Sequence, residues 1–76
     1  MAIYYYYNNN GKWLLIDKNN NFCLDNIFKV GSGYTELPNF GLSYLDFYNM
    51  KFLYNNVNCD IVRLNYELNL KYLNKR

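Results

Sequence analysis

The chain of 76 residues contains no histidine, two cysteines and one proline. It therefore lacks the side chain that most often performs acid–base catalysis near neutral pH. Cys23 and Cys59 have neither a CxxC spacing nor a histidine with which to share a metal ion, which argues against a zinc site. Because no signal-peptide pattern is present, we expect two reduced, buried thiols rather than a disulfide. We expect no metal and no cofactor.

Long apolar runs and strong charge are also missing. The longest apolar runs fall far short of the ~20 residues that cross a membrane. A net charge of +2 is too weak to attract nucleic acid or a membrane surface strongly by itself. The one local excess of charge is a basic C-terminus, Lys71, Lys75 and Arg76, which charge patterning favours as a solvated tail. We expect a cytoplasmic protein without a membrane partner.

Hydrophobic and aromatic residues are abundant. They make up 51% and 21% of the chain, against 18% charged residues, which is the opposite of the composition of a disordered chain. The short length leaves room for one core, so we expect a single domain over residues 1–76. The excess of Asn, Tyr, Lys, Ile and Phe, which have A- and T-rich codons, indicates an AT-rich genome.

The N-terminal third predicts an antiparallel meander. Asn10-Gly11 favours a two-residue hairpin turn, because both residues tolerate positive φ, and this turn places Tyr7 opposite Leu14. The asparagines at 19–21 predict a three-residue loop into a third strand. One face then carries Ile3, Tyr5, Tyr7, Leu14, Ile16, Phe22, Leu24 and Phe28 as the core. The other face carries Tyr4, Tyr6, Trp13, Leu15, Asp17, Cys23, Asp25 and Lys29. A two-residue loop is the alternative, and it would exchange the faces of the third strand.

A glycine-rich turn follows the predicted third strand. The segment Gly31-Ser32-Gly33 lacks the third glycine of a dinucleotide fingerprint, since position 36 is Glu36, so we interpret it as a turn. Residues 34–37 predict a short strand that Pro38 ends, and a strand that ends at proline belongs at a sheet edge.

The segment after this strand allows two structures. Ser43 and Asp46 fit a capping box, which predicts a helix over residues 43–54. The composition is a weak helix former, because Tyr, Phe and Asn are mediocre in helices. A β-hairpin through Asn55-Asn56 is the alternative.

The C-terminal segment has the most regular pattern in the chain. Apolar and polar residues alternate from Val62 to Tyr72, which predicts a long, half-buried strand. Such a strand is longer than its partners, so its free edge suggests a homodimer formed through an edge strand. The predicted class is α+β: a small antiparallel sheet, made of the N-terminal meander and this strand, with one short helix on one face. An all-β fold is the alternative.

No group of residues indicates an enzyme. Asp17 and Asp25 form the only predicted carboxylate pair, and their places next to turns favour solvated surface groups over a dyad with perturbed pKa values. Ser32, Thr35 and Ser43 have no base that the sequence could supply. We therefore expect a non-enzymatic protein.

The tyrosines suggest a binding surface. Tyr4, Tyr6 and Trp13 share one predicted face, and three basic residues flank them, namely Lys12, Lys18 and Lys29. Such rings suit three uses: filling a core, binding a protein, or stacking on the bases of a nucleic acid. The leading hypothesis is a small protein-binding module that occludes a surface of a larger host protein or nucleoprotein complex, as a phage or mobile-element inhibitor of a host defence or nucleic-acid-processing machine would. The alternative is a small nucleic-acid or nucleotide binder that uses these sheet aromatics.

Overall fold

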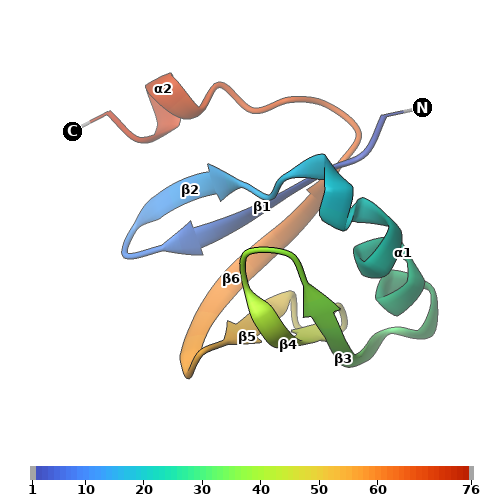
Figure 1. The fold of residues 1–76 in the computed structure, drawn as a ribbon. Helices are drawn as coiled ribbons and strands as arrows, with labels where there is room; N and C mark the ends of the chain where they lie inside the picture. The colour runs from blue at the N-terminus through green and yellow to red at the C-terminus, as the bar shows by residue number, and fades with distance from the viewer. Residues whose placement is uncertain (1, 76) are drawn as a thin grey trace.

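The protein is a six-stranded antiparallel sheet with one helix packed against it, and the computed structural model describes residues 2–75. The first five elements are β1 (Tyr4–Asn9), β2 (Lys12–Leu15), the 3-10 helix η1 (Lys18–Asn20), α1 (Asn21–Val30) and β3 (Ser32–Leu37). The others are β4 (Gly41–Asp46), β5 (Lys51–Tyr54), β6 (Val57–Leu64) and α2 (Leu70–Leu73). The strand order is β2-β1-β6-β5-β4-β3, and the predicted α+β class is confirmed (Figure 1).

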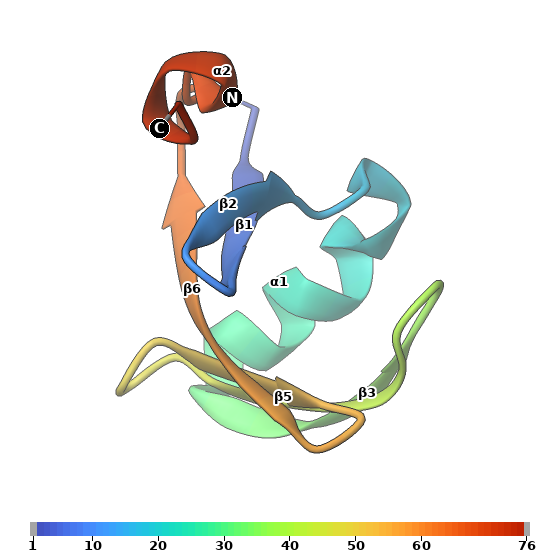
Figure 2. The same ribbon diagram turned by 90° about the vertical axis from the view of Figure 1, so that its left-hand side faces the viewer.

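The sheet is strongly curved around α1. Figure 2 shows β6 running from the β1–β2 hairpin to β5, with α1 on the concave side between the two halves of the sheet. The buried core fills this concave side. Its fully buried members are Tyr5, Ile16, Leu24, Leu37, Leu45, Phe52 and Ile61.

The first hairpin has the predicted turn and register. Asn10 and Gly11 have φ of 54° and 83°, which is the positive φ that a type I′ turn requires. Asn9 pairs with Lys12, and Tyr7 pairs with Leu14. Local turn chemistry was sufficient to determine this element.

The predicted third strand is wrong, because residues 21–30 form α1. The Asp17 side chain accepts a hydrogen bond from the N–H of Asn19 at 3.0 Å and starts a 3-10 turn where a hairpin loop was expected. The Asn21 side chain donates to the carbonyl of Ile3 at 2.9 Å, which holds the helix start against β1. Leu24 is then buried at the centre of the core. Both predicted registers of the third strand are therefore wrong.

The predicted edge strand is confirmed and longer than expected. β3 begins at Ser32 and ends at Leu37, just before Pro38, and it is the last strand in the sheet order. The N–H of Phe40 donates to the carbonyl of Leu37 at 3.1 Å and closes a tight turn into β4. The interpretation of residues 31–33 as a turn holds only for Gly31, the C-cap of α1, because Ser32 and Gly33 already belong to β3.

The predicted helix over residues 43–54 is wrong, because β4 and β5 occupy this segment. Asp46 does not form the predicted capping box with Ser43. Its carboxylate instead accepts hydrogen bonds from the N–H groups of Tyr48 at 3.0 Å and Asn49 at 3.1 Å. These bonds close the β4–β5 turn, and the hydrogen bonds from Asn49 lower the pKa of Asp46. The alternative hairpin is confirmed: Asn55 and Asn56 have φ of 49° and 61° and join β5 to β6.

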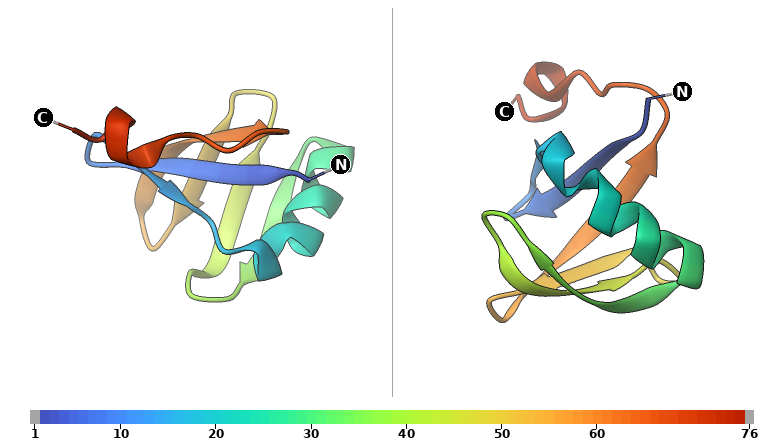
Figure 3. Two further views of the ribbon diagram at one scale, coloured as in Figure 1. Left: turned by 90° about the horizontal axis from the view of Figure 1, so that it is seen from above. Right: turned by 45° about the vertical axis from the view of Figure 1, so that its right-hand side comes forward.

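The C-terminal strand is shorter than predicted and lies inside the sheet. β6 ends at Leu64, and it pairs with β5 over residues 57–60 and with β1 over residues 60–64. Tyr4, the first residue of β1, pairs with Leu64, so the pairing of β1 with β6 ends at this point. The chain turns back and ends in α2, which lies beside β2 (Figure 3). The free edge expected beyond Leu64 does not form, because β6 ends there, and a homodimer through an edge strand stays a prediction.

Candidate interaction surface on the outer face of the sheet

The predicted row of Tyr4, Tyr6 and Trp13 is largely covered by the chain itself. Tyr6 is only 1% exposed, and its hydroxyl accepts a hydrogen bond from the N–H of Leu68 at 2.9 Å. Tyr4 is half-buried, and the predicted neighbour Lys18 places its ammonium 4.6 Å from the centroid of the Tyr4 ring. The row therefore has no exposed central ring on which a ligand could stack.

The side chain of Asn74 binds the C-terminal segment to β2 by two hydrogen bonds. The N–H of Trp13 donates to Oδ1 of Asn74 at 2.9 Å, and Nδ2 of Asn74 donates to the carbonyl of Trp13 at 2.8 Å. The Asn74 amide therefore pairs with the outer edge of β2 as a residue of another strand would. Trp13 itself is half-buried.

The predicted basic residues do not form one group. Lys12, Lys71 and Lys75 are exposed on β2 and on the C-terminal segment beside it. Lys29 is exposed in the last turn of α1, on a different element. Arg76 lies outside the described residues. The structure therefore places Lys12, Lys71 and Lys75 on neighbouring segments of the chain, and Lys29 on another element.

A group of exposed apolar residues lies elsewhere, on the convex side of β3, β4 and β5. Tyr34, Tyr44 and Leu53 stand directly opposite one another on these three strands. Leu42 lies two residues before Tyr44 and therefore on the same face. Tyr34, Leu42 and Leu53 are 70%, 64% and 41% exposed, and the Tyr34 and Tyr44 rings lie 4.8 Å apart. We call these four residues the outer aromatic face.

The outer aromatic face contains a hollow and is bordered by polar groups. The hollow measures about 150 Å³ and also reaches the turn residues Asn55 and Asn56. The next row of the sheet carries the ion pair between Lys51 and Asp60. An apolar centre with a polar rim is typical of a protein interface. The signal in the sequence was the two-residue spacing of Leu42 and Tyr44, and the helix prediction concealed it.

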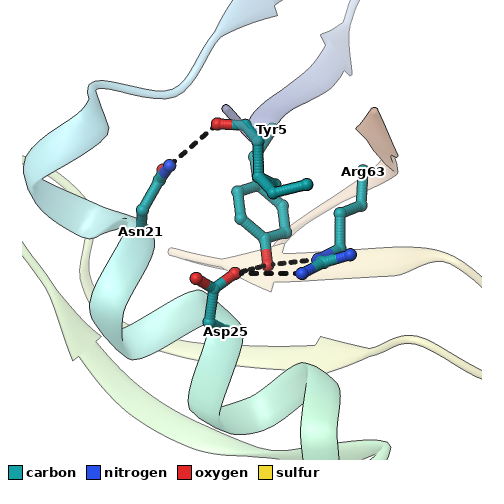
Figure 4. A network of polar contacts seen from close by, with 5 residues as sticks. Tyr5, Asn21, Asp25 and Arg63 are labelled. Carbon is teal, nitrogen blue, oxygen red and sulfur yellow. Dashed lines mark hydrogen bonds and ion pairs between the residues drawn. The ribbon is translucent and has the colours of Figure 1, made fainter. Parts of the chain in front are cut away.

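A second polar group, made of Tyr5, Asp25 and Arg63, joins β1, α1 and β6 (Figure 4). The Tyr5 hydroxyl donates a hydrogen bond to Oδ1 of Asp25, and Nε of Arg63 donates to the same hydroxyl at 2.9 Å. The Arg63 guanidinium lies 3.5 Å from the Asp25 carboxylate and 4.0 Å from the centroid of the Phe28 ring. Asp25 and Arg63 neutralise each other, so this group holds the helix to the sheet. Asp17 has a different role, as the cap of η1.

We expect this polar group to make the protein less stable at high pH. Burial, and then the hydrogen bond to Asp25, raise the pKa of Tyr5. A raised folded-state pKa means that the stabilisation is complete below the unfolded pKa, about 10, and is lost as the pH rises further. In urea unfolding at increasing alkaline pH, wild type should therefore lose more free energy of unfolding than Tyr5→Phe. Tyr66→Phe, at an exposed position, should behave like wild type. Equal slopes for wild type and Tyr5→Phe would contradict this prediction.

Comparisons with known proteins identify no relative of this chain. No protein-family model, no curated protein and no solved structure matches the chain. The longest helix in residues 2–75 is α1 with 10 residues, and no helix in this range has the length and apolarity needed to cross a membrane.

Proposed function

We propose that this protein is a small, non-enzymatic protein-binding module that covers a surface of a larger partner with its outer aromatic face. The observation that carries the proposal is the exposure of Tyr34, Leu42 and Leu53 side by side on neighbouring strands. Tyrosine is enriched among the residues that contribute most to binding energy. Because the sheet already holds these side chains in place, little conformational entropy is lost on binding.

The proposed partner is a component of a host defence or nucleic-acid-processing machine, and the protein is a phage or mobile-element inhibitor in the host cytoplasm. The support is the small size of the domain, its AT-rich composition and a sequence without histidine or a group of residues suited to catalysis. Such a domain can act by steric occlusion alone, which requires an interface and no chemistry.

The alternative, a nucleic-acid binder that uses Tyr4, Tyr6 and Trp13, has less support. Tyr6 is buried, and the C-terminal segment covers its hydroxyl. A salt titration separates the two functions, because phosphate contacts weaken steeply with salt and an apolar interface hardly responds.

The test is a pull-down from the native host with four tagged proteins: wild type, Leu42→Asp, Leu53→Asp and the matched control Phe22→Asp. Phe22 is 78% exposed on α1, so its replacement introduces the same charge at an exposed apolar position outside the outer aromatic face. We expect one host protein to be retained by wild type and Phe22→Asp and to be lost with both leucine variants.

The retained protein is then purified and its affinity for each variant is measured. Losing a residue that dominates an interface costs about 2 kcal/mol, so each leucine variant should bind about 30-fold more weakly or worse. Circular dichroism of every variant checks that the fold is intact. Equal binding by wild type and both leucine variants, all folded, would reject the outer aromatic face as the binding site.

A further inference from the structure

The sheet has two edge strands, β2 and β3, and only the outer edge of β2 is hydrogen-bonded to another segment of the described chain. At β2, the side chain of Asn74 bonds to both the N–H and the carbonyl of Trp13, and α2 lies alongside. β3 is the last strand at the other edge of the sheet. Among residues 2–75, no strand pairs with the side of β3 that faces away from β4. Unpaired strand edges are templates for another strand.

The backbone groups on the free side of β3 can be assigned. The N–H of Phe47 donates to the carbonyl of Gly31 at 2.8 Å, and the same register continues along β3 and β4. In an antiparallel pair the hydrogen-bonded residues alternate. Gly33 and Thr35 therefore direct their backbone groups towards β4. Ser32, Tyr34 and Glu36 direct theirs outwards, to the free edge.

We propose that two copies of this chain form a dimer by antiparallel pairing of β3 with β3, with Tyr34 opposite Tyr34 of the second copy. This register sets Ser32 opposite Glu36 of the second copy, and Glu36 opposite Ser32. All three outward-facing residues of each strand then have partners, which gives about six backbone hydrogen bonds.

Charge and aromatic packing favour this register. Glu36 is the one charged residue in β3, and the pairing places it opposite a serine hydroxyl instead of a second carboxylate. A register centred on Glu36 would oppose two negative charges, which is destabilising. Centring on Tyr34 adds an aromatic cross-strand pair and continues the Tyr34–Tyr44 row into the second copy.

The asymmetry of the two edges limits the assembly to two copies. A β3–β3 contact is related by a two-fold axis, so it uses the same surface on both copies and closes. Further growth would require the β2 edge, where Asn74 occupies the backbone groups of Trp13. The dimer is independent of the proposed function, although it would place two outer aromatic faces on one continuous sheet.

Cysteine cross-linking of the full-length protein tests the register, in a background in which Cys23 and Cys59 are replaced by alanine. Directly opposed, hydrogen-bonded residues have Cα atoms about 5.5 Å apart, which is within the range of a disulfide. Tyr34→Cys should therefore form a covalent dimer under mild oxidation. Glu36→Cys alone should not, because its two thiols would be offset by four residues, or about 13 Å. Ser32→Cys mixed with Glu36→Cys should again give a cross-linked dimer.

Light scattering at high micromolar concentration tests the dimer without cross-links. Wild type should have twice the monomer mass, and Tyr34→Lys should be a monomer, because two ammonium groups would face each other. Leu53→Asp should remain a dimer even where it loses the host partner, so the two proposals fail separately. A monomer mass for wild type, or cross-linking of Glu36→Cys alone in place of Tyr34→Cys, would overturn the inference.

Discussion

Replacing Phe52 by alanine should lower the free energy of unfolding by about 3–5 kcal/mol. Phe52 is 0% exposed, and its ring lies 5.6 Å from that of Tyr7, 5.2 Å from that of Phe40 and 4.9 Å from that of Tyr54, centroid to centroid. The substitution removes the apolar contacts and the central member of this aromatic cluster at once. A domain of this length has a total stability of about 4–11 kcal/mol, so the substitution should remove a large share of it.

Urea unfolding followed by circular dichroism measures the effect. Phe52→Leu, which keeps most of the volume, should cost about 1 kcal/mol and remain folded. Phe22→Ala is the matched control: the same residue type, 78% exposed, should change the free energy of unfolding by less than about 0.5 kcal/mol. Similar losses for Phe52→Ala and Phe22→Ala would show that the aromatic cluster is not the centre of stability.

Replacing Asn74 by alanine should release the C-terminal segment from β2. The substitution removes both hydrogen bonds to the Trp13 backbone. Together, two typical hydrogen bonds contribute about 1–3 kcal/mol to the free energy of unfolding. Trp13 is the single tryptophan, so its fluorescence reports this site alone and should shift to longer wavelength as water reaches the ring. Amide exchange of Trp13 should accelerate more than that of Phe52 in the core.

Lys75→Ala is the control for this experiment, because it alters the neighbouring exposed side chain and leaves the two bonds in place. It should leave the fluorescence and the exchange of Trp13 unchanged. Since Asn74→Ala also frees the β2 edge, assemblies larger than a dimer should appear at high concentration. Unchanged Trp13 exchange in Asn74→Ala would mean that other contacts hold the segment.

The elements that the sequence determined by itself are those whose information is local. The Asn10-Gly11 turn requires positive φ within the turn, and its two residues supply it, so both the turn and the register of β1 with β2 were predictable. The same holds for the strand that ends just before Pro38. Each depends on backbone preferences that act over a few residues.

Tertiary structure decided the elements whose local pattern fits two periods. Residues 21–30 fit a strand or a helix, and the helix forms because Leu24 is buried in the core and Asn21 bonds to Ile3. Residues 62–72 alternate throughout, yet β6 ends at Leu64, opposite Tyr4, where β1 begins. Tertiary structure also decided the outer aromatic face, because its residues come together only when β3, β4 and β5 pair. A period states which side chains share a face, whereas only the neighbouring strands decide which face is covered.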